Sequence, residues 1–255
     1  MTWDPERYLA FGDERTRPAL DLLARVPLAR SERIADLGCG PGNATALLAA
    51  RWPEAAIVGL DNSPEMLAQA RASGVRAAWV EADIAGWTPD RPFDLIYCNA
   101  TLHWLGDHQS LLPRLLGYAC PGGVFAAQMP RNFAAPSHAL LRETAASGPW
   151  ADRLAGIRDW QPVAPPEWYY DLLAPLARAL DVWETEYLHA LEGDDPVLAW
   201  TRGTALRPIR QALDAEQLAA FEAAYAARLR TAYPRRADGR TMFPFRRLFI
   251  VAQRS

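Results

Sequence analysis

Short apolar runs alternate with amphipathic segments over the first half of the chain. The runs are four to six residues long and nearly continuous, which is typical of buried parallel strands; they lie at 33–36, 56–61, 76–80, 93–98 and 124–129. Helical spacing of the apolar residues between them predicts helices at 43–51, from Pro64 onward and at 110–118, with Ser63 as the N-cap of the second. Strands that alternate with helices predict a doubly wound, Rossmann-like α/β fold.

The alternation loosens after Met129, where prolines and tryptophans become frequent. The same reasoning predicts helices at 137–147, 167–177, 196–204 and 215–233, and two further strands at 181–189 and 246–252. The sheet then has seven strands, and the helical insertions are expected to cap the face at which the parallel strands end.

We therefore expect a single domain over residues 1–255. Its parts are a pair of N-terminal helices that covers a bound cofactor (1–30), a cofactor-binding core (31–130), two helical segments that cover a substrate (131–180 and 191–240) and a final strand (245–253). Tyr8 and Phe11 indicate the first N-terminal helix, and Leu20, Leu22 and Leu23 the second. The alternative is that these two helices only pack on the edge of the sheet.

Charge and cysteine content exclude several classes of protein. The chain has 255 residues and a formal net charge of −3, and all of its basic residues are arginine, which argues against a broad nucleic-acid-binding face. No segment approaches the ~20 apolar residues of a membrane span, and the N-terminus does not resemble a signal peptide. Cys39, Cys98 and Cys120 lie far apart without metal-ligand spacing, so we expect reduced thiols, no metal and a cytoplasmic protein.

The segment Asp36-Leu37-Gly38-Cys39-Gly40-Pro41-Gly42 links the first strand to its helix, as in nucleotide-type cofactor sites. A dinucleotide loop would have glycine or alanine where Asn43 stands, and Asp36 would repel a pyrophosphate. A carboxylate at that place suits a cationic ligand, such as the amino end of S-adenosylmethionine. A dinucleotide loop and a glycine turn without any ligand are the alternatives.

Two more carboxylates follow predicted strands at the same edge of the sheet. Asp61 ends the second strand, where a carboxylate can accept both hydroxyl groups of a ribose. Asp83 follows the third strand and could accept from an adenine amino group while Ile84 packs on the ring. The alternative for each aspartate is a helix cap or a solvated side chain.

The fourth strand leads into Asn99-Ala100-Thr101-Leu102-His103-Trp104, in a position that lies beside the reacting group in open α/β sheets. His103 is a candidate general base, or a polar residue that only lines the cleft.

These motifs together resemble those of the class I S-adenosylmethionine-dependent methyltransferases, which have a seven-stranded sheet of this type. Nearly from end to end the chain also resembles the trans-aconitate 2-methyltransferase family. The stretches that carry this second resemblance are Tyr8–Phe11, Arg15–Ala19, Leu23–Leu28, Gln128–Pro130, Tyr169–Asp171, Gly203–Pro208 and Arg247–Ala252. His103, where family members can have glutamine, and Arg131, where an acidic residue is usual, depart from the pattern.

The resemblance implies a cofactor, S-adenosylmethionine, with S-adenosylhomocysteine as product. Its expected contacts are Asp36, Gly38, Gly40, Gly42, Asn43, Asp61, Asn62, Met66, Asp83, Ile84, Asn99 and Trp104. It also implies methyl ester formation on one carboxylate of an unsaturated tricarboxylic acid, with His103 and Trp104 nearest the reaction.

Arginine is the natural clamp for the other carboxylates of such a substrate. The expected substrate contacts are Arg207, Arg247, Tyr169, Tyr170, Arg131 and Arg17, and for each arginine the alternative is a surface ion pair.

Other functions remain open at this point. The chain could methylate another small di- or tricarboxylic acid, or bind the cofactor without catalysis. Methylation of RNA or protein would need a basic patch or a dedicated binding domain, which the sequence does not indicate. We therefore expect a small polycarboxylate as the only partner, without nucleic acid or membrane, and a monomer or weak homodimer.

Overall fold

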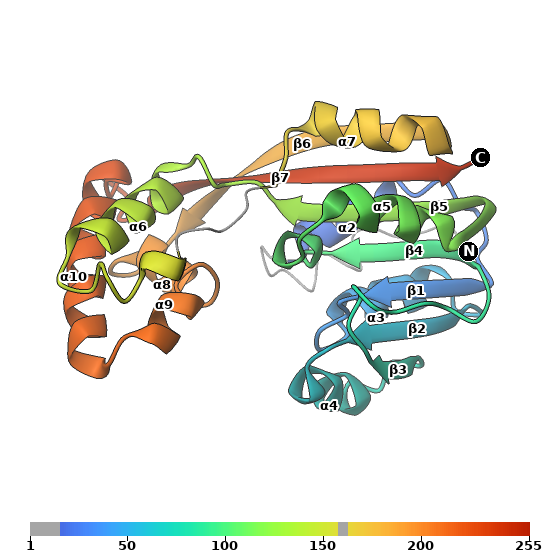
Figure 1. The fold of residues 1–255 in the computed structure, drawn as a ribbon, viewed down its shortest axis with the longest axis horizontal. Coiled ribbons are helices and arrows are strands. Elements are labelled where there is room, and N and C mark those ends of the chain that lie inside the picture. Colours follow the sequence, from blue (N-terminus) through green and yellow to red (C-terminus); the bar gives the residue numbers. More distant parts are fainter. Residues whose placement is uncertain (1–15, 158–162) are drawn as a thin grey trace. The chain divides into compact units, whose positions relative to one another are not determined.

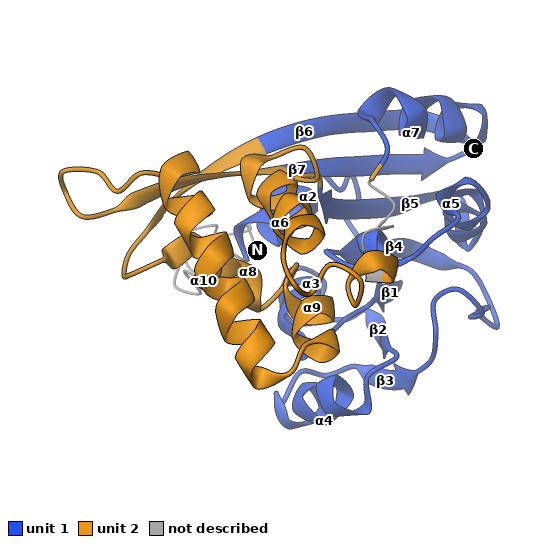
Figure 2. Ribbon diagram, turned by 60° about the vertical axis from the view of Figure 1, so that its left-hand side comes forward, with its two compact units in different colours: residues 1–130, 164–185, 247–255 blue, residues 131–163, 186–246 orange. Residues whose placement is uncertain are grey.

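A computed structural model describes residues 16–157 and 163–255, which form two compact units (Figures 1 and 2). Unit 1 contains the residues up to Pro130, Ala164–Thr185 and Arg247–Ser255; unit 2 contains Arg131–Val163 and Glu186–Arg246. The two longest strands, β6 and β7, run from one unit into the other, so each unit is built from segments distant in sequence.

One sheet of seven strands, in the order β3-β2-β1-β4-β5-β7-β6, is formed by the described residues. The strands are β1 Arg33–Leu37, β2 Ala56–Asp61, β3 Ala78–Glu81, β4 Phe93–Asn99, β5 Ala119–Pro130, β6 Ala177–Leu191 and β7 Thr241–Arg254. Strands β1 to β5 pair in parallel, and β7 pairs antiparallel with β5. The predicted Rossmann-like fold class is confirmed.

The chain order of the strands reverses beside β1, because β2 and β4 pair with its two edges. In open α/β sheets the ligand binds at such a point, outside the carboxyl ends of the strands. The glycine segment of residues 38–42 leaves β1 there and enters helix α3, Asn43–Arg51.

Helices α4 (Pro64–Ala72) and α5 (His108–Gly117) begin at side-chain caps. The Ser63 hydroxyl accepts from the Met66 N–H, which confirms the predicted cap, and Asp107 caps α5 through the Ser110 N–H. In Figure 1, α5 lies over β4 and β5. The remaining elements of unit 1 are α2 (Arg17–Ala24), α7 (Pro166–Leu173) and the short 3-10 helices η1 (Leu102–Trp104) and η3 (Ala174–Leu176).

Helix α2 is fixed to the sheet by polar contacts as well as by its apolar face. The buried Tyr97 hydroxyl on β4 donates to the Ala19 carbonyl at 2.8 Å, and Arg51 donates to the carbonyls of Leu23 and Val26. For residues 17–24 the structure therefore shows a helix packed on the sheet. The predicted first helix, with Tyr8 and Phe11, lies outside the described residues, so the N-terminal cofactor lid stays a prediction.

Several predicted boundaries differ from the structure. Strand β5 begins at Ala119 instead of 124, because the Pro121-Gly122-Gly123 segment, expected as a turn, continues the strand through an irregular pairing with β4. Strand β7 is twice as long as expected, and helix α9 (Arg207–Ala212) was not predicted. In these places the hydrogen bonds to a neighbouring strand, or the packing against other elements, decide the secondary structure in place of the local sequence preference.

Unit 2 has a hydrophobic core of its own between helices and the unit 2 parts of β6 and β7. Helix α10 (Ala215–Ala232), capped by Asp214, packs against α6 (Pro136–Ser147) and α8 (Pro196–Arg202). The core contains Phe221, Tyr225, Phe243 and Phe245, all nearly inaccessible to solvent. One more 3-10 helix, η2 (Ala155–Ile157), completes the unit. Whether its helices cover a substrate stays a prediction.

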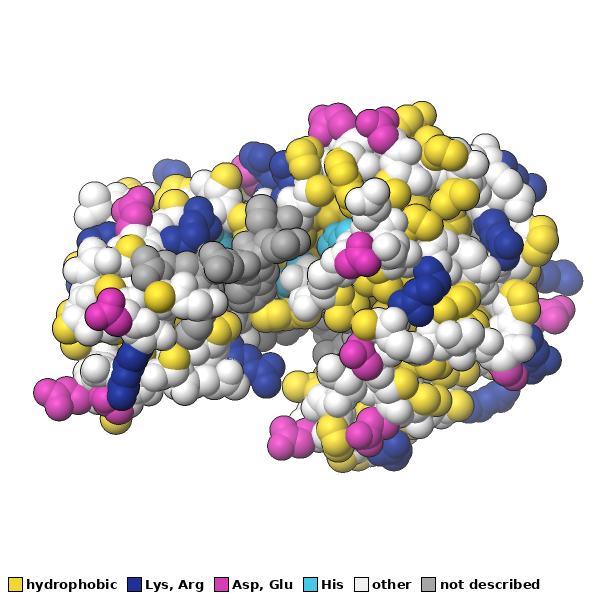
Figure 3. Space-filling model, viewed as in Figure 1, with side chains coloured by type: hydrophobic (Ala, Val, Ile, Leu, Met, Phe, Trp, Pro, Cys, Tyr) yellow, Lys and Arg dark blue, Asp and Glu magenta, His cyan; other side chains and the backbone are white. Residues whose placement is uncertain are grey.

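Charged side chains of both signs are interspersed on the face shown in Figure 3. This mixture agrees with the small net charge of −3. Along the described part of the chain, no helix combines the length and apolar character needed to cross a membrane.

Candidate functional site at the carboxyl ends of the parallel strands

Asp36 is fully buried near the end of β1, and one of its oxygens is satisfied. The Thr45 hydroxyl, from the first turn of α3, donates to Oδ2 at 2.6 Å, whereas Oδ1 has no hydrogen-bond partner among the described residues. Burial, partly offset by the Thr45 bond and increased by the nearby Asp61, raises the Asp36 pKa to about 7. A buried acceptor without a donor is unfavourable, so this atom is poised for a cationic or donor group of a ligand.

The glycine segment is held against strands on both sides of β1. Gly38 has φ +72°, and a Cβ at this position would lie 2.2 Å from the Thr101 side chain, so only glycine fits. The N–H groups of Gly38 and Cys39 both donate to the Leu60 carbonyl on β2. By contrast, a Cβ on Gly40 would have open space around it, so the loop backbone can be approached closely there.

Asp61 braces this loop from the end of β2. Its Oδ2 accepts from the Gly40 N–H and its Oδ1 from the Ser63 N–H, both at 2.9 Å. A carboxylate has about four lone-pair positions, so two remain for a ligand such as a ribose. The two alternatives for Asp61, ligand contact and local cap, are therefore compatible.

Trp79 on β3 was not singled out from the sequence. It pairs with Gly59 on β2, and its ring occupies the space that a Cβ on Gly59 or Gly42 would fill, at 2.5 and 3.0 Å. The indole therefore supports the glycine segment from the β3 side. The signal available in the sequence was a large aromatic residue on a strand whose expected neighbour contains a glycine.

The other predicted cofactor residues of β2, β3 and the loops after them differ in exposure. Asn43, Asn62 and Met66 are exposed, as is Asp83, whose Oδ1 accepts from the Ala85 N–H at 2.9 Å. Ile84 is only 5% exposed, which leaves little of its side chain for contact with an adenine ring.

A chain of polar side chains, of which Gln128 and Arg247 are buried and Asn99 is half-buried, connects the end of β4 with β7. The Gln128 amide nitrogen donates to Asn99 Oδ1 at 2.6 Å, and Arg247 donates to Gln128 Oε1 at 3.2 Å. Gln128 is 1% and Arg247 6% exposed. Asn99, a predicted cofactor residue, and Arg247, a predicted substrate residue, are thus linked through Gln128. The sequence did not indicate Gln128 as a site residue.

His103 lies in η1, half-buried, directly after the β4 loop. Its Nδ1 is buried and has no hydrogen-bond partner in residues 16–157 and 163–255. Burial, with the positive charge of Arg247 and the nearby His108 as smaller causes, lowers its pKa to about 3. The ring is therefore neutral at pH 7 and a weak proton acceptor, which argues against the general-base interpretation. The neighbouring Trp104 is 50% exposed.

Tyr169 was expected to contact a substrate, but its hydroxyl is engaged inside the fold. His108 Nε2 must donate to the Leu102 carbonyl, which leaves Nδ1 as an acceptor for the Tyr169 hydroxyl at 2.8 Å. Tyr169 is fully buried and also accepts from the Ala164 N–H, whereas Tyr170 is 51% exposed on α7. The structure thus gives Tyr169 a contact that joins α7 to α5.

The four arginines proposed as carboxylate clamps are divided between the units. Arg247 and Arg17 belong to unit 1, the former buried and the latter exposed at the start of α2. Arg131 and Arg207 belong to unit 2, where Arg207 is exposed at the start of α9. Arg247 is joined through Gln128 to Asn99, one of the predicted cofactor residues. Among the described residues, no cluster of histidine, cysteine or acidic side chains has the arrangement of a metal site.

The fold agrees with that of known methyltransferases. A family model described as a methyltransferase domain matches residues 34–123. The crystal structure of the YcgJ protein from Bacillus subtilis superposes with a TM-score of 0.60 at 18% identity, covering 94% of this chain and 99% of that one. Phosphoethanolamine N-methyltransferase 2 of Haemonchus contortus, solved with S-adenosyl-L-methionine, superposes at 0.56 and 15% identity, covering 94% of this chain and 53% of that one.

The sheet order, the glycine segment and the family match define the class as methyltransferase. Similarity in sequence is much closer to one family within it. Trans-aconitate 2-methyltransferase of Azoarcus sp. (strain BH72) is 54% identical over 253 residues, which is 99% of this chain and 99% of the relative. The chain belongs to the trans-aconitate 2-methyltransferase family.

Proposed function

We propose that this protein is an S-adenosylmethionine-dependent carboxyl O-methyltransferase that converts trans-aconitate to its monomethyl ester. Full-length similarity at 54% identity supports the substrate. The observation that carries the cofactor assignment is the buried Asp36 carboxyl under the glycine segment, with one oxygen lacking a partner among the described residues.

The residues present fit this cofactor. Asp36 Oδ1 would accept from its cationic amino end, and the open space over Gly40 would admit its close approach to the backbone. Asp61 keeps two lone-pair positions for the ribose hydroxyls, and the exposed Asp83 is available to the adenine. When bound, S-adenosylmethionine supplies an electrophilic methyl group on a sulfonium.

The chain does not need to remove a proton from the substrate. A carboxylic acid with a pKa near 4 is already ionised at pH 7, so a substrate oxygen can attack in line as the carbon–sulfur bond breaks. The neutral His103, with its pKa of about 3, is consistent with this absence of base catalysis. The contribution of the protein is to align the reactants and exclude water, which is worth up to ~7–11 kcal/mol in favourable cases.

Arg247 is our proposed carboxylate clamp in unit 1. It is a buried guanidinium on β7 whose position is fixed by Gln128, which is itself fixed by Asn99 at the end of β4. Its planar group can hold a carboxylate by two parallel hydrogen bonds. Gln128 would act as a positioning residue, because it orients Arg247 and Asn99 together.

The Asp36 pKa predicts that cofactor binding weakens in mild acid. Only the ionised carboxylate attracts the cationic amino end, and with a pKa of about 7 it is mostly ionised at pH 8 and mostly protonated at pH 6. The dissociation constant for S-adenosylhomocysteine, measured by calorimetry, should rise about tenfold between pH 8 and pH 6. A pH-independent constant over this range would contradict the contact with Asp36.

The substrate assignment is tested by steady-state methyl transfer to trans-aconitate, cis-aconitate, citrate and isocitrate under equal conditions. We expect kcat/KM for trans-aconitate to exceed that for each of the others. Turnover with a different acid would keep the enzyme class and replace the substrate. Binding of S-adenosylhomocysteine without turnover of any acid would leave a cofactor-binding protein that does not methylate these compounds.

A further inference from the structure

Unit 2 contains a cavity of about 760 Å³ along β6 and β7, and the core residue Tyr233 is also part of its wall. Met242, Pro244 and Arg246 line it from alternate positions of β7, whereas the intervening Phe243 and Phe245 face the core. The segments 131–136 and 232–236 form the other walls. All of the lining residues that lie in the described parts of the chain belong to unit 2.

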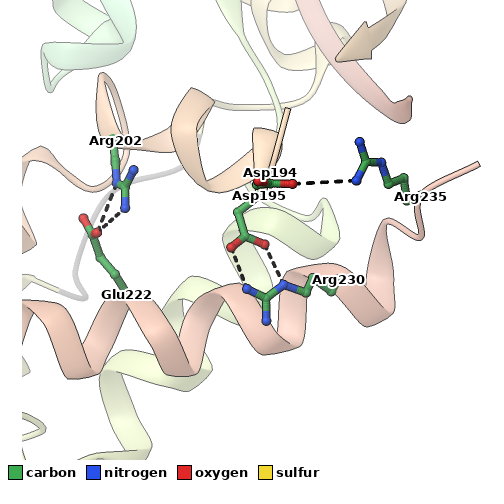
Figure 4. Close-up of polar contacts among 6 residues, drawn as sticks. All are labelled: Asp194, Asp195, Arg202, Glu222, Arg230 and Arg235. Atoms are coloured by element: carbon green, nitrogen blue, oxygen red, sulfur yellow. Dashed lines mark hydrogen bonds and ion pairs between the residues drawn. The ribbon is translucent and has the colours of Figure 1, made fainter. Parts of the chain in front are cut away.

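The lining is strongly positive. Among the described lining residues, four are arginines, namely Arg131, Arg235, Arg236 and Arg246, and one is acidic, Glu186. Glu186 pairs with Arg246 at 3.5 Å, but both side chains are about half exposed, so the pair is weak and can be exchanged for a ligand. Arg235 is turned toward Asp194, which is 99% exposed, at 3.7 Å (Figure 4).

Other arginines of unit 2 are engaged more firmly. Arg230 donates two hydrogen bonds of 2.6 Å to Asp195, and Arg202 donates to Glu222 (Figure 4). In each of these pairs, the carboxylate neutralises the charge of the arginine. The cavity is therefore a local excess of positive charge, and not part of a uniformly basic surface.

Asn132 adds an independent indication of a ligand. It lines the cavity, is only 4% exposed, and its Oδ1 accepts from the Arg246 N–H at 2.7 Å. That bond fixes the orientation of the amide, so that Nδ2 is its remaining polar atom. Nδ2 is buried and has no acceptor within the described parts of the chain. An oxyanion in the cavity would satisfy it.

We propose that this cavity binds small polycarboxylate anions, with Asn132, Arg236 and Arg246 as contacts. Arginine forks and an amide donor match carboxylate oxygens, and Leu188, Met242 and Pro244 provide an apolar surface for a short hydrocarbon skeleton. Unsaturated tricarboxylates have this chemistry, so the choice of ligand rests on the proposed function. A phosphate compound would share the oxyanion chemistry and is separated from it by the test.

The test is calorimetric binding of trans-aconitate, citrate and inorganic pyrophosphate to the full-length protein saturated with S-adenosylhomocysteine. The double variant Arg236→Gln/Arg246→Gln should bind the polycarboxylates at least tenfold more weakly in this cavity, while binding at the Arg247 site persists. The matched control, Arg142→Gln/Arg210→Gln, removes two exposed arginines of unit 2 that do not line the cavity, and its affinity should stay within twofold. Equal affinity of wild type and the cavity variant for every probe would overturn the proposal.

Asn132→Asp sharpens the test, because it keeps the oxygen that accepts from Arg246 and replaces the donor by an acceptor. The arginines around it should stabilise the new carboxylate, so the variant should unfold at a higher temperature while losing at least tenfold in polycarboxylate affinity. A merely structural Asn132 would not give this combination, and unchanged affinity would contradict its role.

The outcomes are distinguishable from a failure of the proposed function. If wild type binds the acids through this cavity but does not methylate them, the cavity stands and the substrate assignment fails. If methylation of trans-aconitate is intact and the cavity variant binds the acids with the affinity and stoichiometry of wild type, the cavity proposal fails alone. Tight binding of pyrophosphate only, lost in the cavity variant, would overturn polycarboxylates in favour of phosphate compounds.

Discussion

Replacement of Asp36 by asparagine should weaken binding of S-adenosylhomocysteine about a hundredfold and at the same time stabilise the ligand-free protein at pH 8. The loss of affinity follows because a hydrogen bond to a charged, buried group contributes up to ~3 kcal/mol. Asparagine retains an oxygen that accepts from Thr45, so the local structure is preserved. Calorimetry of the ligand and thermal unfolding without ligand measure the two effects.

The gain in stability has a definite pH dependence. Asp36 has a pKa of about 7 in the folded protein and about 4 when unfolded, so the folded form holds the extra proton between these values. The free energy of unfolding of wild type therefore falls as the pH rises from 4 to 7. The Asp36→Asn variant has no such pH-dependent contribution from position 36. We expect its advantage in melting temperature to be present at pH 8 and to disappear near pH 4.

Asp181→Asn is a suitable control, because Asp181 forms an exposed ion pair with Arg25. It should change neither the affinity nor the pH profile of stability. An Asp36→Asn protein that binds the ligand as tightly as wild type would exclude Asp36 as the anchor of the cofactor.

Replacement of Arg247 by methionine should lower kcat/KM for trans-aconitate about a hundredfold or more. Methionine fills much of the buried space of the arginine stem but cannot hold a carboxylate, and loss of one partner of a buried, charge-assisted contact costs ~2–5 kcal/mol. Arg247→Lys keeps the charge without the planar fork, so its loss should be intermediate. Steady-state kinetics provides the measurement.

Binding of S-adenosylhomocysteine to Arg247→Met should change much less than turnover, which would show that the protein is folded. Arg178→Met, a change of an exposed arginine on β6, should have kinetics close to wild type. If Arg247→Met had the kinetics of wild type, Arg247 would have only a structural role, as a hydrogen-bond partner of Gln128.

The parts of the site that lie close together in sequence could be predicted. The glycine segment with Asp36, the aspartate at the end of β2 and the Ser63 cap are local signals, because turns and caps impose residue types at fixed spacing. The doubly wound fold class also followed from the alternation of strands and helices.

Contacts between distant segments could not be predicted. Trp79 meets Gly59 only through the register of β2 with β3, and Gln128 meets Arg247, 119 positions further on, through the antiparallel pairing of β5 with β7. The pair Arg246-Arg247 looks uniform in sequence, yet one side chain is exposed and the other buried, because alternate residues of a strand face opposite sides. The hydrogen bond between Tyr169 and His108 likewise joins residues 61 positions apart.

The central claim is that the protein transfers a methyl group from S-adenosylmethionine to a carboxylate of trans-aconitate. The most direct measurement uses cofactor labelled in the methyl group, with trans-aconitate as the acceptor and analysis of the product before and after mild alkaline hydrolysis. We predict one label per acceptor, in a product that releases labelled methanol in alkali, as a methyl ester must. Label that stays on the acceptor in alkali, or no transfer to trans-aconitate at all, would contradict the account.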